Sequence, residues 1–201
     1  NFLKHFPSEE ITLYADNVSD ETYEWLQTYD LEVIRTNGGS SAAGFRIVLD
    51  EALKLDDTEI VYFVEDDYLH LENSRQVLLE GLERTDYVTL YDHVDKYMPA
   101  SEGGNPYIDE DAAEETKVFL TKSSHWKLTN STTMTFAAKV KTLREDEPTW
   151  RKHIEGKHPN DFGCFIELRN NGRSLSSPIP GLSTHCEPMW AAPLIDWEQV
   201  N

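Results

Sequence analysis

A continuous apolar run that ends in three acids is the feature that most constrains the fold of this chain. Residues 60–64 read IVYFV, and Glu65, Asp66 and Asp67 follow directly. A strand with one face in water alternates apolar and polar residues, whereas a strand covered on both faces is apolar throughout. The run therefore predicts a central strand, buried on both faces, that ends in a cluster of carboxylates.

Strand and helix patterns alternate around this run. Strands are predicted at 11–17, 31–37, 60–64 and 86–94, and helices between them at 19–29, 41–55 and 74–85. Such alternation is typical of right-handed βαβ units. We therefore expect an α/β fold of the Rossmann-like kind, with a mainly parallel central sheet and helices on both faces.

The second half of the chain changes character. Segments 117–122 and 132–140 are β-like, and helical patterns return at 143–155 and 161–172. Asn160 is a candidate N-cap of the last helix. We expect these β-like segments to form a small antiparallel addition to the sheet. Because the chain has 201 residues and no linker, we expect a single domain over 1–201.

Charge and cysteine content restrict the partners and the compartment. The net charge is −19 and the 18 Lys and Arg residues are scattered, which argues against a nucleic-acid partner. No stretch approaches the roughly 18 to 20 apolar residues that span a bilayer, and no secretion signal is recognisable. Two cysteines are compatible with a reducing compartment. We expect a soluble cytoplasmic protein.

Three carboxylates at a strand end require a compensating charge. In an open parallel sheet, ligands bind beyond the carboxyl ends of the strands, which is where Glu65, Asp66 and Asp67 fall. Neighbouring carboxylates repel by about 4 kcal/mol per close pair at an effective dielectric constant of ~20. A partly buried cluster therefore takes up protons or binds a cation such as Mg²⁺ or Mn²⁺. The alternative is a cluster that caps a helix or faces solvent.

A later segment supplies a second set of features. Asn160 and Asp161 open a helix, Gly172 ends it, and Pro180 and His185 follow. With the earlier acids, this order resembles the GT-A glycosyltransferases, especially family-2-like members and their small virus-encoded domains, over essentially the whole chain. In that family a strand ends in an Asp-X-Asp-type motif, and an acidic pair, a glycine, a proline and a histidine come much later.

The resemblance implies a role for each matching residue. Asp67 would bind a divalent ion, Glu65 or Asp66 would hold the ribose or a metal-bound water, and His185 would add a nitrogen ligand, which favours Mn²⁺ over Mg²⁺. Asp161, at a helix N-terminus, would be the general base. The implied activity is metal-dependent, inverting transfer of a sugar, of hexosyltransferase type. The donor would be a nucleoside-diphosphate sugar, with UDP favoured, and the acceptor a hydroxyl of a glycan or another molecule.

The first half resembles the nucleotide-binding part of the family. Asp16 matches the aspartate that touches the base, and Arg46 lies on a helix that would pack beside the nucleotide. Roughly 1–94 would then bind the nucleotide and 95–201 the acceptor. The chain departs from the family in that it begins after the family's first strand, which supplies part of the uridine pocket. It also carries Asn160 in place of an acid.

Two other functions remain open on the sequence alone. A metal-dependent phosphohydrolase or nucleotidyltransferase also uses adjacent acids at a strand end. A non-catalytic module that binds carbohydrate or nucleotide sugar is the second alternative. Trp126, Trp150 and Trp190 are candidates for stacking on sugars, although core packing is favoured for at least two of them. The loop at 37–41, NGGSS, matches no phosphate-binding fingerprint, so a plain turn is favoured.

Overall fold

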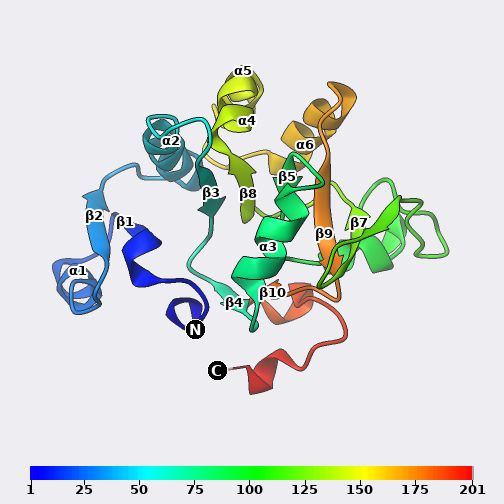
Figure 1. The fold of residues 1–201 in the computed structure, drawn as a ribbon, viewed down its shortest axis with the longest axis horizontal. Coiled ribbons are helices and arrows are strands. Elements are labelled where there is room, and N and C mark those ends of the chain that lie inside the picture. The colour runs from blue at the N-terminus through cyan, green and yellow to red at the C-terminus, as the bar shows by residue number, and fades with distance from the viewer. Residues whose placement is uncertain (201) are drawn as a thin grey trace.

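The first half of the chain alternates strands and helices as the sequence predicts (Figure 1). A computed structural model describes residues 1–200. The elements of the first half are β1 (Thr12–Asp16), α1 (Asp20–Leu26), β2 (Glu32–Thr36), α2 (Ser41–Ala52), β3 (Ile60–Phe63), β4 (Tyr68–His70), α3 (Ser74–Leu82) and β5 (Tyr87–Val88). The strand predicted at 86–94 is much shorter than expected, and β4 was not predicted.

The second half contains more strands than the sequence patterns indicated. Its elements are β6 (Val118–Leu120), β7 (His125–Leu128), β8 (Phe136–Lys139), α4 (Val140–Glu145), α5 (Glu147–His153), α6 (Asp161–Asn170), β9 (Leu175–Ile179) and β10 (Ser183–His185). The single helix predicted at 143–155 is two helices that meet at Asp146. Pro148 explains the break, because proline cannot donate the backbone hydrogen bond that a continuous helix needs there.

The main sheet is mixed, so the prediction of a mainly parallel sheet was wrong. Its six strands lie in the order β3-β8-β5-β9-β7-β6, and only β5 and β9 pair in parallel. β8 lies between β3 and β5 and is antiparallel to both. Of the two segments predicted to form a small antiparallel addition, 132–140 contains β8, which lies inside the sheet, and 117–122 contains β6, which pairs antiparallel with β7 at the edge.

β3 lies at the edge of this sheet, Ile60 is 37% exposed and only Phe63 of this strand is buried, so the prediction of a central strand buried on both faces was also wrong. An apolar run alone does not distinguish an edge strand from a central one.

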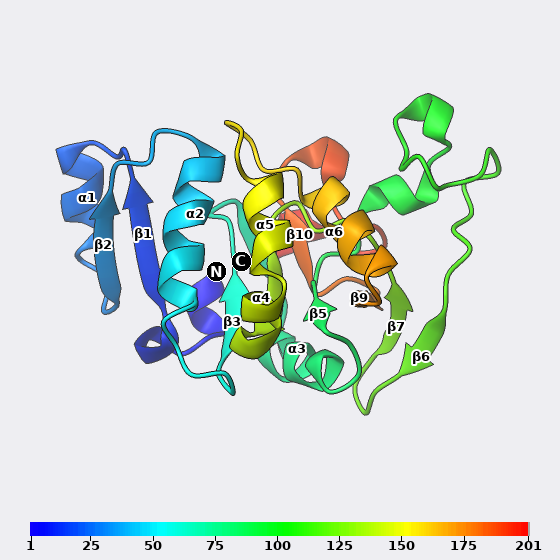
Figure 2. The ribbon, with the colours of Figure 1, turned by 90° about the horizontal axis from the view of Figure 1, so that it is seen from above.

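Two small sheets accompany the main one. β1 and β2 pair in parallel across α1, as predicted for a βαβ unit, and β4 pairs antiparallel with β10. Figures 1 and 2 place β1, β2 and α1 at one end of the molecule, beside the β3 edge of the main sheet. Among residues 1–200, no strand joins β1 to β3.

Helices cover both faces of the six-stranded sheet, as predicted. On one face, α2, α4, α5 and α6 pack over a core of aromatic side chains (Figure 2). The Phe136 and Trp150 rings stack there with centroids 4.7 Å apart, and the Phe165 ring meets both edge-on at 5.4 Å. This aromatic cluster ties β8 to α5 and α6.

The opposite face packs against α3. Val77, Leu78 and Leu82 of this helix meet Val88 and the fully buried Trp126. Gly81 permits the close approach, because a Cβ atom at this position would lie only 2.6 Å from the Trp126 ring.

Core packing is confirmed for two of the three candidate tryptophans. Trp126 and Trp150 are fully buried, and Trp190 is partly exposed.

None of the helices in residues 1–200 has the length and apolar character needed to cross a membrane. The fold class, from the strand pairings and the helices on both faces, is α/β with a mixed central sheet.

We expect Trp150→Ala to lower the free energy of unfolding by about 3 to 5 kcal/mol, because it leaves a cavity among rings that cannot collapse into it. Urea denaturation measures the effect. Trp25→Ala is the control, since Trp25 is 56% exposed and its loss is expected to cost less than about 1 kcal/mol. Equal losses in the two variants would contradict the assignment of Trp150 to the core.

Candidate active site

The three acids after β3 lie in the turn that leads into β4. Asp66 and Asp67 form the turn itself and are exposed, whereas Glu65 is partly buried. The Glu65 backbone N–H donates to the Thr135 hydroxyl, at 3.2 Å, which ties this turn to the segment before β8. The predicted position of the acids, directly beyond the end of the strand, is confirmed.

His185 lies against Asp67 because β4 and β10 pair. The register sets His185 opposite Tyr68, and the Cys186 backbone N–H donates to the Asp67 carbonyl at 2.8 Å. As a result, His185 Nε2 is 2.9 Å from Asp67 Oδ2. The Tyr68 ring packs edge-on against the imidazole and limits its movement. The structure thus brings together the two residues that the family resemblance assigns to metal binding.

Asp161 begins α6 but does not cap it. The Asn160 side chain is the cap and accepts from the Gly163 N–H at 3.0 Å, as predicted. Asp161 points instead toward the segment before β8, where its Oδ2 accepts from the Thr132 hydroxyl at 2.9 Å and from the Met134 N–H at 3.4 Å. Its carboxylate is therefore held by groups outside its own helix.

The carboxylates form one electrostatic cluster. Burial, followed by the negative charges of Asp67, Asp161 and Asp66, raises the pKa of Glu65 to about 7. Asp161 and the acids after β3 are linked by one short segment, since Thr132 and Met134 donate to Asp161 and the Thr135 hydroxyl accepts from the Glu65 N–H. Five predicted residues from three distant segments, including His185, meet at one end of the sheet.

The segment that holds Asp161 has an unusual backbone. Thr133 and Met134 have φ angles of 44° and 57°, in the left-handed region that non-glycine residues rarely occupy. The Tyr68 hydroxyl donates to the carbonyl groups of Thr132 and Thr133, at 3.4 and 3.5 Å. Sequence analysis missed this turn because no glycine or asparagine marks it.

Asp16 organises the loop at 37–41. Its carboxylate accepts from the Thr36 hydroxyl at 2.9 Å and from the N–H groups of Gly38 and Gly39, at 2.5 and 3.1 Å. Burial acts to raise the pKa of Asp16, but these hydrogen bonds outweigh it and lower the pKa. The loop is therefore a turn closed on Asp16, and its N–H groups at Gly38 and Gly39 point at that carboxylate.

Arg46 does not contact the acids that follow β3. Its guanidinium donates to the carbonyl of Ile154, at the end of α5. Among residues 1–200, no hydrogen bond or ion pair joins Arg46 or Asp16 to the acids after β3. Nucleotide binding by these two residues stays a prediction.

The donor set at the acid cluster fits a small divalent ion with few protein ligands. No group of three or more His, Cys, Asp and Glu side chains in residues 1–200 is arranged to hold a metal. Asp67 Oδ2 pairs with His185 Nε2 at 2.9 Å, so these are the two side chains that would hold the ion, one through oxygen and one through nitrogen. Water and substrate phosphate usually supply the remaining ligands of such an ion.

Two hollows of the surface, of about 640 and 420 Å³, flank α3, and none of the predicted site residues lines them. Comparison with known proteins adds no relative: no family model matches the chain, and no curated protein matches it.

We expect Glu65→Gln to stabilise the metal-free protein increasingly as the pH rises. The unfolded chain releases the Glu65 proton near pH 4.5 and the folded protein near pH 7. Between these values the folded state binds more protons, so wild-type stability falls as the pH increases. At about 1.4 kcal/mol per pKa unit, the variant gains up to about 3 kcal/mol over this range.

Urea denaturation in chelator, at about pH 5 and about pH 8, measures this difference. Asp66→Asn is the control, because Asp66 is an exposed member of the same turn and should change stability by less than about 1 kcal/mol at either pH. A Glu65→Gln gain that does not grow with pH would show that Glu65 is ionised in the folded protein like an exposed acid.

Proposed function

We propose that this chain is a GT-A-like glycosyltransferase domain. It would transfer a sugar from a nucleoside-diphosphate sugar, with UDP favoured, to a hydroxyl group of a glycan or another acceptor. The observation that carries the proposal is that Asp67, in the turn after β3, pairs with His185, and that Asp161 and Glu65 both contact the segment 132–135 beside that turn. An α/β fold with helices on both faces of its sheet supports it.

Asp67 and His185 would hold the ion, Mn²⁺ or Mg²⁺. When bound, the ion neutralises diphosphate charge and stabilises the leaving nucleotide. The mixed oxygen and nitrogen donor set favours Mn²⁺. Asp66 is exposed at the same turn, where it can accept hydrogen bonds from the ribose. Glu65 is the more buried of the acids, and its carboxylate form becomes favourable once a cation offsets the neighbouring charges.

Asp161 would act as the general base. Its Oδ2 is occupied by Thr132 and Met134, while Oδ1 receives no hydrogen bond from any residue in 1–200. Oδ1 is therefore the atom that would accept the proton of the acceptor hydroxyl. Holding one carboxylate oxygen fixes the direction of the other, which is the positioning that a base needs. Attack from the face opposite the leaving nucleotide inverts the anomeric centre.

We expect Asp67→Ala to abolish Mn²⁺-dependent binding of UDP, because it removes the oxygen ligand beside His185. Isothermal titration calorimetry of UDP with and without Mn²⁺ measures the loss. Asp30→Ala is the control, since Asp30 is an exposed acid between α1 and β2. Unchanged affinity in the Asp67 variant would overturn the assignment of this residue.

Asp161→Asn is expected to keep donor binding and to lower transfer by about 10² to 10⁴-fold, since it removes proton acceptance. Transfer is measured with a panel of nucleotide sugars and acceptors. A phosphohydrolase or nucleotidyltransferase would release phosphate or pyrophosphate without needing an acceptor. A binding module would bind the nucleotide sugar, show no turnover, and be indifferent to this substitution.

A further inference from the structure

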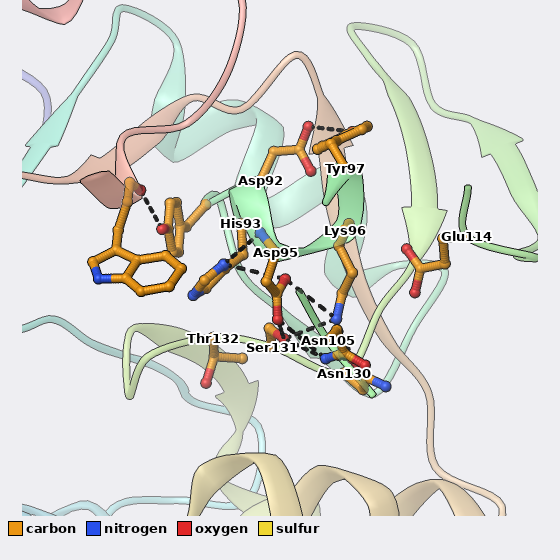
Figure 3. A network of polar contacts seen from close by, with 12 residues as sticks. Asp92, His93, Asp95, Lys96, Tyr97, Asn105, Glu114, Asn130, Ser131 and Thr132 are labelled. Carbon is orange, nitrogen blue, oxygen red and sulfur yellow. Dashed lines mark hydrogen bonds and ion pairs between the residues drawn. The ribbon is translucent and has the colours of Figure 1, made fainter. Parts of the chain in front are cut away.

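A buried lysine, Lys96, belongs to a polar network that includes Asp95, Asn130 and Ser131 (Figure 3). Lys96 belongs to the 3₁₀ turn Val94–Tyr97 that follows β5, and it is only 1% exposed. Its ammonium group donates to Asn130 Oδ1 and, at 2.8 Å, to Ser131 Oγ. Both acceptors lie in the loop that connects β7 to β8, so Lys96 ties that loop to the chain after β5.

Asp95 and Asn105 complete the network. Asp95 Oδ2 accepts from Ser131 Oγ at 3.0 Å and from Asn105 Nδ2 at 3.1 Å, and Asp95 Oδ1 is 3.5 Å from the ammonium group. His93 Nδ1 lies 3.1 Å from the same carboxylate oxygen. The start of the loop is thus held by groups that are almost entirely buried.

Such a network is difficult to explain as a source of stability. Burying a lysine and an aspartate removes both from water, and apolar residues of similar volume stabilise a core equally well or better. A buried network of hydrogen bonds instead holds the chain segment that it contacts in one conformation. The chain bound here is the loop at 130–135.

The same loop holds Asp161. Directly after Ser131, the Thr132 hydroxyl and the Met134 N–H donate to Asp161 Oδ2. The backbone of both Thr133 and Met134 occupies the left-handed region. Backbone of this kind persists only where the surroundings hold it. Lys96 holds the beginning of the loop, and at its other end the Thr135 hydroxyl accepts from the Glu65 backbone N–H.

We propose that Lys96 is a positioning residue for the transfer reaction. Through Asn130 and Ser131 it fixes the loop 130–135 in the conformation that aims Asp161 at the acceptor hydroxyl. The role in transfer rests on the proposed function. The role in holding the loop does not, and it can be measured without any substrate.

Lys96→Met is the principal variant and Lys127→Met its matched control. Lys127 is also buried, at 3% exposed, and pairs with Asp92 at 3.0 Å and with the Tyr97 hydroxyl at 3.1 Å. None of its hydrogen bonds or ion pairs within residues 1–200 reaches the loop 130–135. Both variants lose a buried charge, so a general loss of stability affects both. Ser131→Ala is the milder variant, which removes one partner each of Lys96 and Asp95.

Amide hydrogen exchange at Met134, followed by NMR in the absence of any ligand, is the first readout. We expect exchange to accelerate at least about tenfold in Lys96→Met and Ser131→Ala, because the loop then opens locally. Relative to unrelated core amides, Lys127→Met should leave it unchanged. If neither Lys96→Met nor Ser131→Ala changes Met134 exchange more than the control does, Lys96 does not hold the loop.

Kinetics with a productive donor and acceptor are the second readout. We expect kcat to fall at least about tenfold in Lys96→Met and Ser131→Ala with the donor KM unchanged, and no further fall when either is combined with Asp161→Asn. An undiminished effect of Lys96→Met in the Asp161→Asn background would overturn the positioning role. Absence of transfer in the wild type would instead refute the proposed function and leave the exchange result standing.

Discussion

The pairing of β8 with both β3 and β5 is the constraint on which the candidate site depends. β8 runs antiparallel between the strand that leads to the acids and the strand that leads to Lys96. The loop that enters β8 is therefore placed between these two strand ends. It meets Glu65 through Thr135, Asp161 through Thr132, and Lys96 through Ser131. A different position for β8 would separate all three contacts.

Charge is distributed unequally around this loop. On one side, the acids after β3 repel one another, and Glu65 holds its proton to about pH 7. On the other side, Lys96 and Asp95 offset each other within a dense set of hydrogen bonds. A bound cation would offset the charges of the first arrangement, whereas in the second Lys96 already pairs with Asp95. The proposed metal site and the Lys96 network thus both contact one short segment.

Local features of the fold were predictable from the sequence, because they depend on neighbours in the chain. Ser19 and Ser40 cap α1 and α2 through the N–H groups of Thr22 and Ala43, and Asn160 caps α6. The acids beyond β3 were placed correctly for the same reason. Pairings between distant strands were not predictable. The register that sets His185 beside Asp67 depends on β4 and β10, which are three residues long and carry no strong pattern. The direction of β8 is likewise not encoded within its own residues.

The left-handed turn at Thr133 and Met134 lowers the stability of the fold but fixes the groups that hold Asp161. Glycine or asparagine would adopt these backbone angles at lower energetic cost, and the chain uses neither. In this conformation, which costs folding energy, the Thr132 hydroxyl and the Met134 N–H both point at Asp161 Oδ2. Selection for thermal stability alone would therefore favour substitutions that relax this turn. In such variants Asp161 would no longer be held in a fixed direction.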